Sequence, residues 1–255
     1  ALVEARKVGT VRVAGSTESE GFRRVPRQDE LQLDPAAAYV HVTTNNTIYG
    51  TQWRDLPDTS DVPLVADASS DIFSAPTDVS RFGVLYAGGQ KNLGPSGVTV
   101  VVIRRDLLER SATLLPSMLS YALHAANGSR YNTPNTFGIY ILGLVARWMR
   151  DEGGLAALAT RNARKAAALY AEVDRTGFYT GYAEPSSRSL MNVTFRLSSE
   201  ALDEAFAADA ARAGLDGLKG HRSTGGLRAS IYNAFPEAGV DALVQFMREF
   251  ERTKG

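Results

Sequence analysis

A series of short apolar runs limits what this chain can fold into. The runs are rich in Val, Leu and Tyr, are separated by polar or Gly/Pro segments, and cover residues 11–14, 38–42, 64–66, 83–86 and 98–103. Their continuous rather than alternating apolarity predicts strands that are covered on both faces. Helices must supply that cover, so the pattern predicts an α/β fold with a mostly parallel sheet.

A change of pattern near residue 153 divides the chain. The apolar segment TFGIYILGLVARWMRDEGG predicts a long helix that stops at a glycine pair, and an Ala-rich segment from 154 to about 175 predicts a helix that bridges two domains. The segments beyond it predict a smaller α+β domain with strands at 190–197 and near 228–232, a helix at 199–213 and a final helix. We therefore predict a large domain at 1–153 and a small C-terminal domain at 154–255.

Charge and cysteine content narrow the function classes. Lys plus Arg and Asp plus Glu are equal at 28 each, which argues against a nucleic-acid or membrane-surface partner and favours a small molecule. The chain has no cysteine, which excludes disulfides, thiolate metal sites and a cysteine nucleophile, and its three scattered histidines predict no metal site. No apolar run is long enough to span a bilayer and no signal peptide is seen, so we expect a cytoplasmic location.

One lysine and one aspartate follow predicted strands. The stretch YAGGQKNLGPSG crowds glycines, an amide and a proline around Lys91, and PLVADASSDIF places Asp67 at the end of an apolar run. Each has an ordinary alternative, because most lysines are solvated and an aspartate at a strand end often caps a turn. Ligands of α/β sheets gather at the carboxyl ends of strands, so as a pair Asp67 and Lys91 are expected to face one crevice.

Pyridoxal phosphate is the cofactor that requires this pair. It needs a lysine amine for a covalent bond and a carboxylate that keeps its pyridine nitrogen protonated. Lys91 would supply the amine and Asp67 the carboxylate. Burial near other positive charge lowers the pKa of a lysine and makes the unprotonated amine available.

Two polar segments fit a phosphate-bearing ligand. HVTTNNTIYGTQW places Asn45, Asn46 and Thr47 just after a predicted strand, where they offer hydrogen bonds, although a plain Asn-rich turn is equally compatible. SRYNTPNTF places Asn132 and Thr133 at the start of the long apolar helix, where free N–H groups favour an anion, although an ordinary helix cap is the alternative.

A basic cluster lies in LKGHRSTGGLRASIYNAF. His221, Arg222 and Arg228 surround a Gly-Gly turn, and no acidic residue lies near them in the sequence. One arginine would be explained by solvation. Three basic groups are more typical of an anchor for an anionic substrate, because arginine makes bidentate contacts with carboxylates and phosphates.

Together these motifs resemble the phosphoserine aminotransferases, which are fold-type I pyridoxal-phosphate enzymes. The resemblance rests on TNNTIYGTQW, VADASSDIFS, GGQKNLGPSG, RYNTPNTFGIY and LKGHRSTGGLRASIYNA, which occur in the family's order, and it extends to the end of the chain. It implies the fold-type I architecture, with a large cofactor-binding domain and a smaller C-terminal domain.

The resemblance assigns cofactor contacts to residues of the large domain. It implies that Lys91 bonds the cofactor, that Asp67 pairs with the pyridine nitrogen, that Thr47 contacts the ring hydroxyl and that Gln90 contacts the phosphate. It also implies a homodimer with shared active sites.

The same resemblance assigns contacts across the dimer and to the substrate. Asn132 and Thr133 would reach the phosphate of the cofactor held by the other subunit. Arg228 would hold the substrate α-carboxylate, with His221 and Arg222 near the substrate phosphate. The implied reaction moves an amino group from glutamate to 3-phosphohydroxypyruvate and yields phosphoserine and 2-oxoglutarate, a step of serine biosynthesis.

The front of the chain departs from the family pattern. Family members begin with a long portion that carries a glycine-rich phosphate loop and an aromatic residue stacked on the pyridine ring, and that portion is not found here. We therefore expect a fragment of a longer protein with little activity of its own. The alternatives are another fold-type I transaminase of the serine:glyoxylate type, or a non-catalytic scaffold that dimerises. A cysteine desulfurase is disfavoured because the chain has no cysteine.

Overall fold

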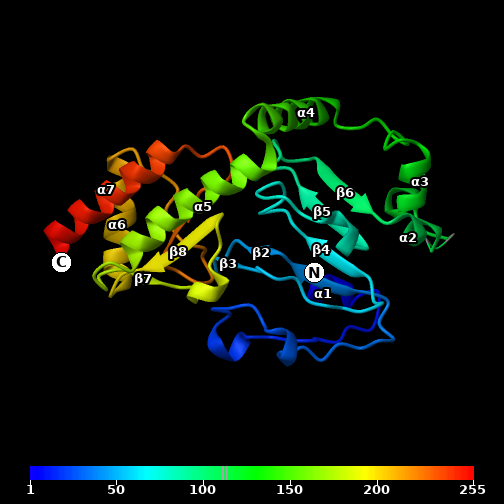
Figure 1. Cartoon of the computed structure of the whole chain (residues 1–255), viewed down its shortest axis with the longest axis horizontal. Coiled ribbons are helices and arrows are strands. Elements are labelled where there is room, and N and C mark those ends of the chain that lie inside the picture. The colour runs from blue at the N-terminus through cyan, green and yellow to red at the C-terminus, as the bar shows by residue number, and fades with distance from the viewer. Residues whose placement is uncertain (111, 113) are drawn as a thin grey trace.

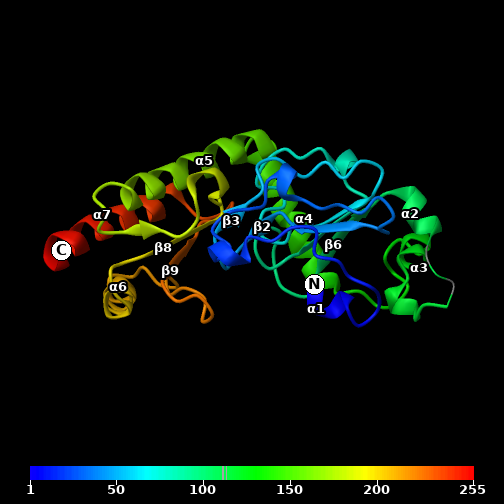
Figure 2. The same ribbon diagram turned by 90° about the horizontal axis from the view of Figure 1, so that it is seen from below.

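The computed structural model describes residues 1–110, 112 and 114–255. It contains two lobes, each built on its own sheet, and a long helix runs from one lobe to the other (Figure 1). Two separate clusters of buried hydrophobic side chains form the cores of the lobes. Seen from below, the two lobes again lie side by side (Figure 2).

The large lobe is built on a mixed four-stranded sheet in the order β1-β4-β5-β6. Its strands are β1 (Val40–Thr43), β4 (Leu64–Asp67), β5 (Val84–Gly88) and β6 (Thr99–Ile103). β1, β4 and β5 are mutually parallel, and β6 is antiparallel to β5. The expected strands at 38–42, 64–66, 83–86 and 98–103 are thus formed, and the α/β prediction is confirmed.

Burial alternates along these strands, and one face of the sheet is covered more fully than the other. The covered face presents buried Val42, Leu64, Ala66, Leu85 and Ala87 to the core of the lobe. Leu142 of α4 (Thr136–Asp151) packs against that core. The opposite face, with His41 and Tyr86, is half-buried.

The parallel strands bring three connections to one edge of the sheet. β4 ends at Asp67, β5 ends at Gly88 just before Lys91, and β1 leads into the hairpin of β2 (Asn45–Asn46) and β3 (Thr51–Gln52). Carboxyl ends of parallel strands meet at the same edge, so these connections become neighbours.

The small lobe packs helices on an antiparallel sheet in the order β7-β8-β9. Its elements are β7 (Thr180–Gly181), β8 (Asn192–Arg196), β9 (Leu227–Ser230), α5 (Gly154–Val173), α6 (Glu200–Arg212) and α7 (Glu237–Lys254). Edge-to-face contacts among Tyr179, Phe195 and Phe206 occupy the centre of its core. The predicted mixture of strands and helices is formed here.

Helix ends follow local signals in the sequence. Ser199 caps α6 by accepting a hydrogen bond from the N–H of Leu202. Asn135 caps α4 in the same way, by accepting from the N–H of Gly138. Gly153 adopts a φ of +97° in the turn between α4 and α5, a conformation that favours glycine. The domain boundary at 153 falls in this turn and stays a prediction.

One expected strand is not formed. The structure leaves residues 11–14 outside any sheet, and the carbonyl of Ala14 accepts a hydrogen bond from the N–H of Gln32 instead. The prediction was wrong because a short apolar run becomes a strand only where another strand is available to pair with it. The chain starts at α1 (Leu2–Ala5), and the N-terminal part that follows runs along the lower side of Figure 1. It reaches the small lobe through the hydrogen bond of 2.7 Å that Tyr182 Oη donates to the carbonyl of Gly21.

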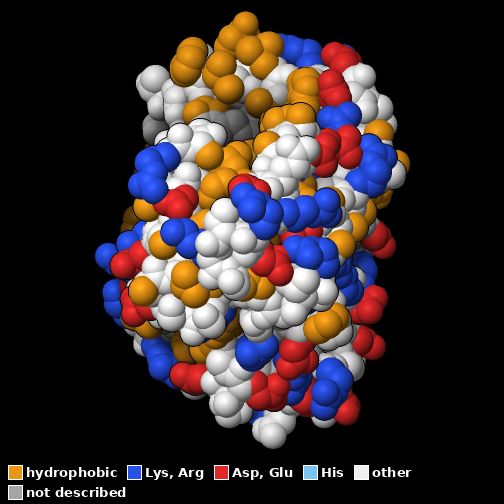
Figure 3. Space-filling view, turned by 90° about the vertical axis from the view of Figure 1, so that its left-hand side faces the viewer, with side chains coloured by type: hydrophobic (Ala, Val, Ile, Leu, Met, Phe, Trp, Pro, Cys, Tyr) orange, Lys and Arg blue, Asp and Glu red, His pale blue; other side chains and the backbone are white. Residues whose placement is uncertain are grey.

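The remaining helices of the large lobe are α2 (Arg105–Glu109) and α3 (Tyr121–Ala126). Within the residues that the structure describes, none of the helices combines the length and apolarity that crossing a membrane requires. On the face shown in Figure 3, basic and acidic side chains are interspersed and hydrophobic side chains gather at the upper end. That face therefore presents no large surface of one charge.

Candidate active site

The loop that carries Lys91 folds back tightly on itself. The N–H of Gly89 bonds to the carbonyl of Val98 at 2.8 Å. A Cβ at residue 89 would lie 2.7 Å from the carbonyl oxygen of Pro95, which is closer than real contacts allow. The glycine is therefore required by the packing of the loop against its own backbone, and this packing holds Lys91 at the end of β5.

Lys91 points toward the turn that follows β1. Its Nζ donates a hydrogen bond of 2.6 Å to Thr47 Oγ1. Burial lowers the pKa of Lys91, and the positive charge of Arg228 acts in the same direction, whereas Asp67 and Asp71 raise it. The ion pairs among the described residues do not include Lys91. The site thus holds an amine whose unprotonated form is favoured relative to an exposed lysine.

Asp67 ends β4 on the half-buried face of the sheet. Its Oδ1 accepts a hydrogen bond of 2.9 Å from the N–H of Ser69, which is the turn contact that the ordinary alternative expected. Its charge nevertheless acts on Lys91, on Tyr86 and on His41, since it shifts the pKa of each. The carboxylate therefore both shapes the turn and supplies negative charge to the crevice.

A second carboxylate, Asp71, lies near Asp67 and was not predicted as a site residue from the sequence. Burial raises its pKa to about 6, against the effect of hydrogen bonds from Thr44 and Gln52. Thr44 Oγ1 donates to Oδ1, and Gln52 Nε2 donates to Oδ2 at 3.1 Å. Asp71 therefore links the end of β1 to β3 and braces the turn that carries Thr47. Its only signal was a second acid one turn after the first in DASSD.

The two asparagines before Thr47 make structural hydrogen bonds within the protein. Asn45 is buried and its Nδ2 donates to Ser70 Oγ and to Asn192 Oδ1, both at 2.9 Å. Asn46 Oδ1 accepts from the N–H groups of Ile48 and Tyr49. The Asn-rich turn is thus the better description of this pair, and only the third residue of the motif, Thr47, contacts Lys91.

Arg228 faces the crevice from the small lobe. In the register of β8 and β9 it pairs with Thr194, so Arg196 lies two residues along β8 on the same face. The Nε atoms of both arginines are buried and have no hydrogen-bond partner within the described part of the chain. Together with His221 they line a small hollow. Arg196 was not predicted as a site residue from the sequence. The available signal was its spacing of two residues from Thr194, which places both side chains on one face of a strand.

Four of the predicted residues, Arg222 among them, stay outside this cluster. Gln90 is exposed, and Asn132 and Thr133 are exposed as well. Asn132 Nδ2 makes only a weak hydrogen bond of 3.5 Å to the carbonyl of Thr133. The cap of α4 is Asn135, so neither of these two residues caps the helix.

Arg222 is exposed, whereas His221 is half-buried and its Nδ1 lies 2.6 Å from Ser223 Oγ. The structure therefore brings together Lys91, Thr47, Asp67 and Arg228, and places His221 beside the last of them.

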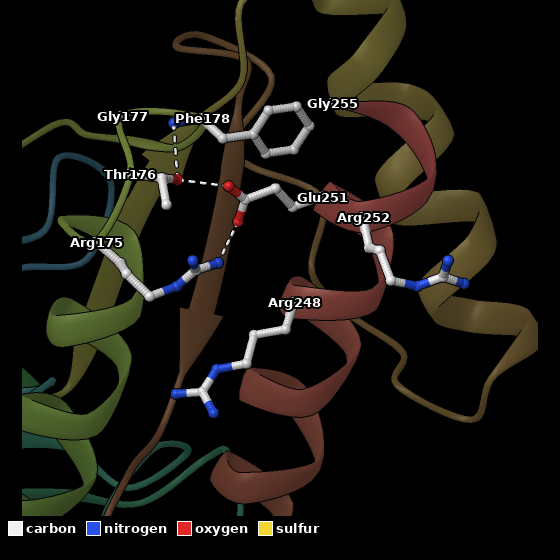
Figure 4. Close-up of a pocket in the computed structure, with 8 residues that line it drawn as sticks. All are labelled: Arg175, Thr176, Gly177, Phe178, Arg248, Glu251, Arg252 and Gly255. Carbon is white, nitrogen blue, oxygen red and sulfur yellow. Dashed lines mark hydrogen bonds and ion pairs between the residues drawn. The ribbon is translucent and has the colours of Figure 1, made fainter.

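Another hollow of the described structure lies at the C-terminal end of the small lobe (Figure 4). It has a volume of about 920 Å³ and is lined by arginines of α7 and of the turn after α5. Those arginines already have carboxylate partners. Arg248 Nε donates to Glu172 at 2.8 Å, and Arg175 pairs with Glu172 and Glu251. The arginines that line this hollow are therefore engaged in an ion-pair network.

Similarity to known proteins identifies the class. Residues 1–243 match the family described as aminotransferase class-V. The chain belongs to the class-V aminotransferases, whose fold agrees with the predicted fold-type I architecture.

Closer relatives identify the branch of that class. The chain is 55% identical over 253 residues to the phosphoserine aminotransferase of Herpetosiphon aurantiacus, covering 99% of this chain and 70% of the relative. A solved phosphoserine aminotransferase from Bacillus circulans subsp. alkalophilus has a TM-score of 0.98 at 50% identity, covering 100% of this chain and 71% of the other. A second solved enzyme of that name, studied for radiation damage of its Schiff base, has a TM-score of 0.97 at 49% identity, covering 99% and 70%. The chain belongs to the phosphoserine aminotransferase family, as its motifs indicated.

Members of this family depend on pyridoxal phosphate. The residues present fit that group. The crevice combines an amine with a lowered pKa, a hydroxyl 2.6 Å from it, a carboxylate and a buried guanidinium nitrogen without a partner in the described structure. This set matches a ligand that has an aldehyde, a ring nitrogen and an anionic substrate beside it.

Proposed function

We propose that this site transfers an amino group from glutamate to 3-phosphohydroxypyruvate, giving phosphoserine and 2-oxoglutarate in serine biosynthesis. The observation that carries the proposal is the position of the Lys91 amine. Thr47 accepts its hydrogen bond, and burial and Arg228 lower its pKa. A proton carrier works best when its pKa lies near the working pH, and these surroundings move Lys91 in that direction.

When bound, pyridoxal phosphate supplies a protonated ring that takes up the electron pair left as the substrate Cα–H bond breaks. Lys91 would hold the cofactor through its amine and, when that amine is free, would take the proton from the substrate Cα. The same amine, now protonated, would then act as the acid that returns the proton.

Asp67 would support the reaction through its negative charge. Its carboxylate would keep the ring nitrogen protonated, and the charged ring would stabilise the electrons of the broken bond. Thr47 would hold the ring hydroxyl by a hydrogen bond and Gln90 would hold the cofactor phosphate, as the family resemblance implies. The support for these roles is the order of the residues along one edge of the sheet.

The basic residues orient the substrate. Arg228 binds the α-carboxylate, so the Cα–H bond is presented to Lys91. His221 and Arg222 bind the phosphate, and this basic cluster favours a phosphorylated substrate over the unphosphorylated substrates of a serine:glyoxylate-type transaminase. Among the described residues the buried Nε atoms of Arg196 and Arg228 have no hydrogen-bond partner, which supports an anionic ligand, because a buried guanidinium is stabilised by a paired anion.

We also propose that the active unit is a homodimer in the cytoplasm. Exposed hydrophobic side chains before and along α4 support a partner surface next to Asn132 and Thr133, which would then contact the cofactor of the other subunit. They include Leu119, Tyr131, Phe137 and Tyr140, which are 66%, 47%, 71% and 58% exposed. The absence of cysteine is compatible with a reducing compartment.

A covalent test decides the cofactor role. The chain is mixed with pyridoxal phosphate, reduced with borohydride and digested, and the peptides are weighed. We expect the adduct on Lys91 and none there in Lys91→Ala. An adduct spread over surface lysines, with Lys91 unmodified, would contradict the proposal. Substrate choice is then tested by adding phosphoserine or serine to the loaded protein. We expect the cofactor absorbance to change with phosphoserine and not with serine.

A further inference from the structure

The residue after the proposed cofactor lysine makes a contact with the small lobe. Asn92 is 5% exposed, and its Oδ1 accepts a hydrogen bond of 3.1 Å from the backbone N–H of Asn233. Its Nδ2 donates to the carbonyl of Ile72 at 3.1 Å. The side chain of Asn92, the residue next to Lys91, is therefore bonded both to the segment that follows Asp67 and to the segment that follows β9.

Asn233 lies where these segments meet. It is 1% exposed and comes from the turn after β9, the strand that carries Arg228. Its Nδ2 donates to the carbonyl of Phe73 at 2.9 Å, and its Oδ1 accepts from Asn162 Nδ2 at 2.8 Å. One side chain thus spans from the large lobe to α5, while its own N–H holds Asn92.

Helix α5 anchors the other end of this connection. Asn162, which is 1% exposed, uses its Nδ2 to bond the carbonyl of Ser74 at 3.1 Å as well as Asn233. One turn further along, Lys165 Nζ donates to three carbonyls of the same turn, those of Ile231, Tyr232 and Phe235. The turn that contains Asn233 is therefore held from α5 at several points.

The chemistry of these contacts explains why amides are used here. Buried hydrogen bonds are directional, and a lost partner leaves a desolvated polar group, so the network has one good arrangement. Hydrophobic packing alone would permit small sliding movements of one lobe on the other. A chain of amides fixes the distance between the segments that carry Asp67, Lys91 and Arg228.

We propose that Asn233 is a positioning residue, which acts through Asn92 to hold the Lys91 amine in the crevice. The inference rests on the proposed role of Lys91, and it assigns Asn233 no contact with substrate or cofactor. It follows from the position of Asn233 between three segments that each carry one residue of the site.

The test measures the Lys91 amine without any cofactor. The chain is labelled with acetic anhydride over a range of pH, and the acetylation of each lysine is followed by mass spectrometry. Lys254, exposed at the end of α7, serves as the internal standard. Lys91 titrates within the surroundings set by Asp67, Asp71, Arg228 and Thr47, so a displaced loop changes its pH profile.

We expect Asn233→Ala to lower the acetylation of Lys91 near pH 8 about threefold or more relative to Lys254, since half a pKa unit changes the unprotonated fraction by about that factor. The direction follows because burial and Arg228 lower the pKa of Lys91, and a loosened loop weakens both effects. Asn162→Ala removes the bonds to Ser74 and to Asn233 but leaves Asn233 bonded to Phe73, so it is expected to give a smaller change in the same direction.

Tyr179→Phe is the matched control. Tyr179 is 2% exposed and donates a hydrogen bond of 2.8 Å to the carbonyl of Met247, inside the core of the small lobe. Its loss should lower the melting temperature while leaving the Lys91 profile unchanged. Should Asn233→Ala behave like this control, Asn233 is only a structural residue and the proposal is overturned.

Two further outcomes are decisive. If Asn233→Ala does not fold, Asn162→Ala carries the test, and an unchanged Lys91 profile in that folded variant overturns the proposal. If the borohydride adduct fails to form on Lys91 in the parent chain, the proposed function falls, whereas the acetylation profiles still decide whether Asn233 positions the amine.

Discussion

Lys91 Nζ and Thr47 Oγ1 lie 2.6 Å apart, although their residues are 44 positions apart in the sequence. The hydroxyl accepts the hydrogen bond, so it stabilises the protonated amine against the effect of burial. This contact joins the loop after β5 to the turn after β1, and it is the closest polar contact that Lys91 makes among the described residues.

Replacing the Thr47 hydroxyl should change the pKa of the Lys91 amine. In Thr47→Val the shape is kept and the acceptor is lost, so we expect the pKa of Lys91 to fall further below its usual range. Acetylation of Lys91 as a function of pH measures this shift. Thr43→Val, at an exposed position of β1, is the control and should leave the profile unchanged. A profile that moves to higher pH in Thr47→Val would contradict the assigned direction of the bond.

Asp67→Asn tests the carboxylate at the end of β4. Its charge raises the pKa of Lys91, so the neutral variant should lower that pKa, and Asn can still accept the N–H of Ser69. Under the proposed function we also expect turnover to fall on the order of 100-fold, because the ring nitrogen loses its charged partner. Stopped-flow absorbance of the loaded enzyme measures the second effect. Unchanged turnover would remove Asp67 from the proposed mechanism.

Asp71 makes stability depend on pH. Its pKa is raised from 3.8 to about 6 in the folded chain, so between these values the folded state binds a proton that the unfolded state does not. Stability should therefore fall as pH rises from about 4 to about 6, by up to about 3 kcal/mol for this group. Urea unfolding of the parent chain and of Asp71→Asn over this range isolates the contribution. Parallel curves for the two proteins would show that Asp71 titrates normally.

The two arginines of the small hollow should separate two parts of a ligand. Arg228→Gln is expected to weaken binding of both serine and phosphoserine, because both carry the α-carboxylate. Arg196 lines the same hollow as His221, on the proposed phosphate side, so Arg196→Gln should weaken phosphoserine alone, by about tenfold. Calorimetric titration of the loaded enzyme measures both. Arg248→Gln is the control, since this arginine lies in the distant hollow of Figure 4 and pairs with Glu172. Equal losses for both ligands in Arg196→Gln would place Arg196 at the carboxylate.

Much of the fold could be predicted because its signals are local. The apolar segment that stops at a glycine pair predicted α4, the helical patterns beyond it predicted α6 and α7, and the apolar runs predicted the strands of the large sheet. Residues 11–14 show where this fails, since an apolar run does not reveal whether a partner strand exists.

The site was predictable only in part, for a related reason. Lys91 lies in a glycine-rich stretch and Arg228 in a basic cluster, and both residues lie in the crevice. Asn92 and Asn233 bond each other across a long stretch of sequence through one side chain and one backbone group, and such a bond leaves no local pattern. Asn45 and Asn46 carried a pattern that fits a turn and a ligand equally well, and packing decided between the two.

The buried amides also bear on how the molecule folds. A chain cut at residue 153 would leave Asn45 without Asn192, and the carbonyls of Phe73 and Ser74 without Asn233 and Asn162. Each lobe would then expose or bury polar groups that have lost their partners. The two lobes have separate cores, yet neither is a self-sufficient folding unit, so they are expected to unfold together in one cooperative transition.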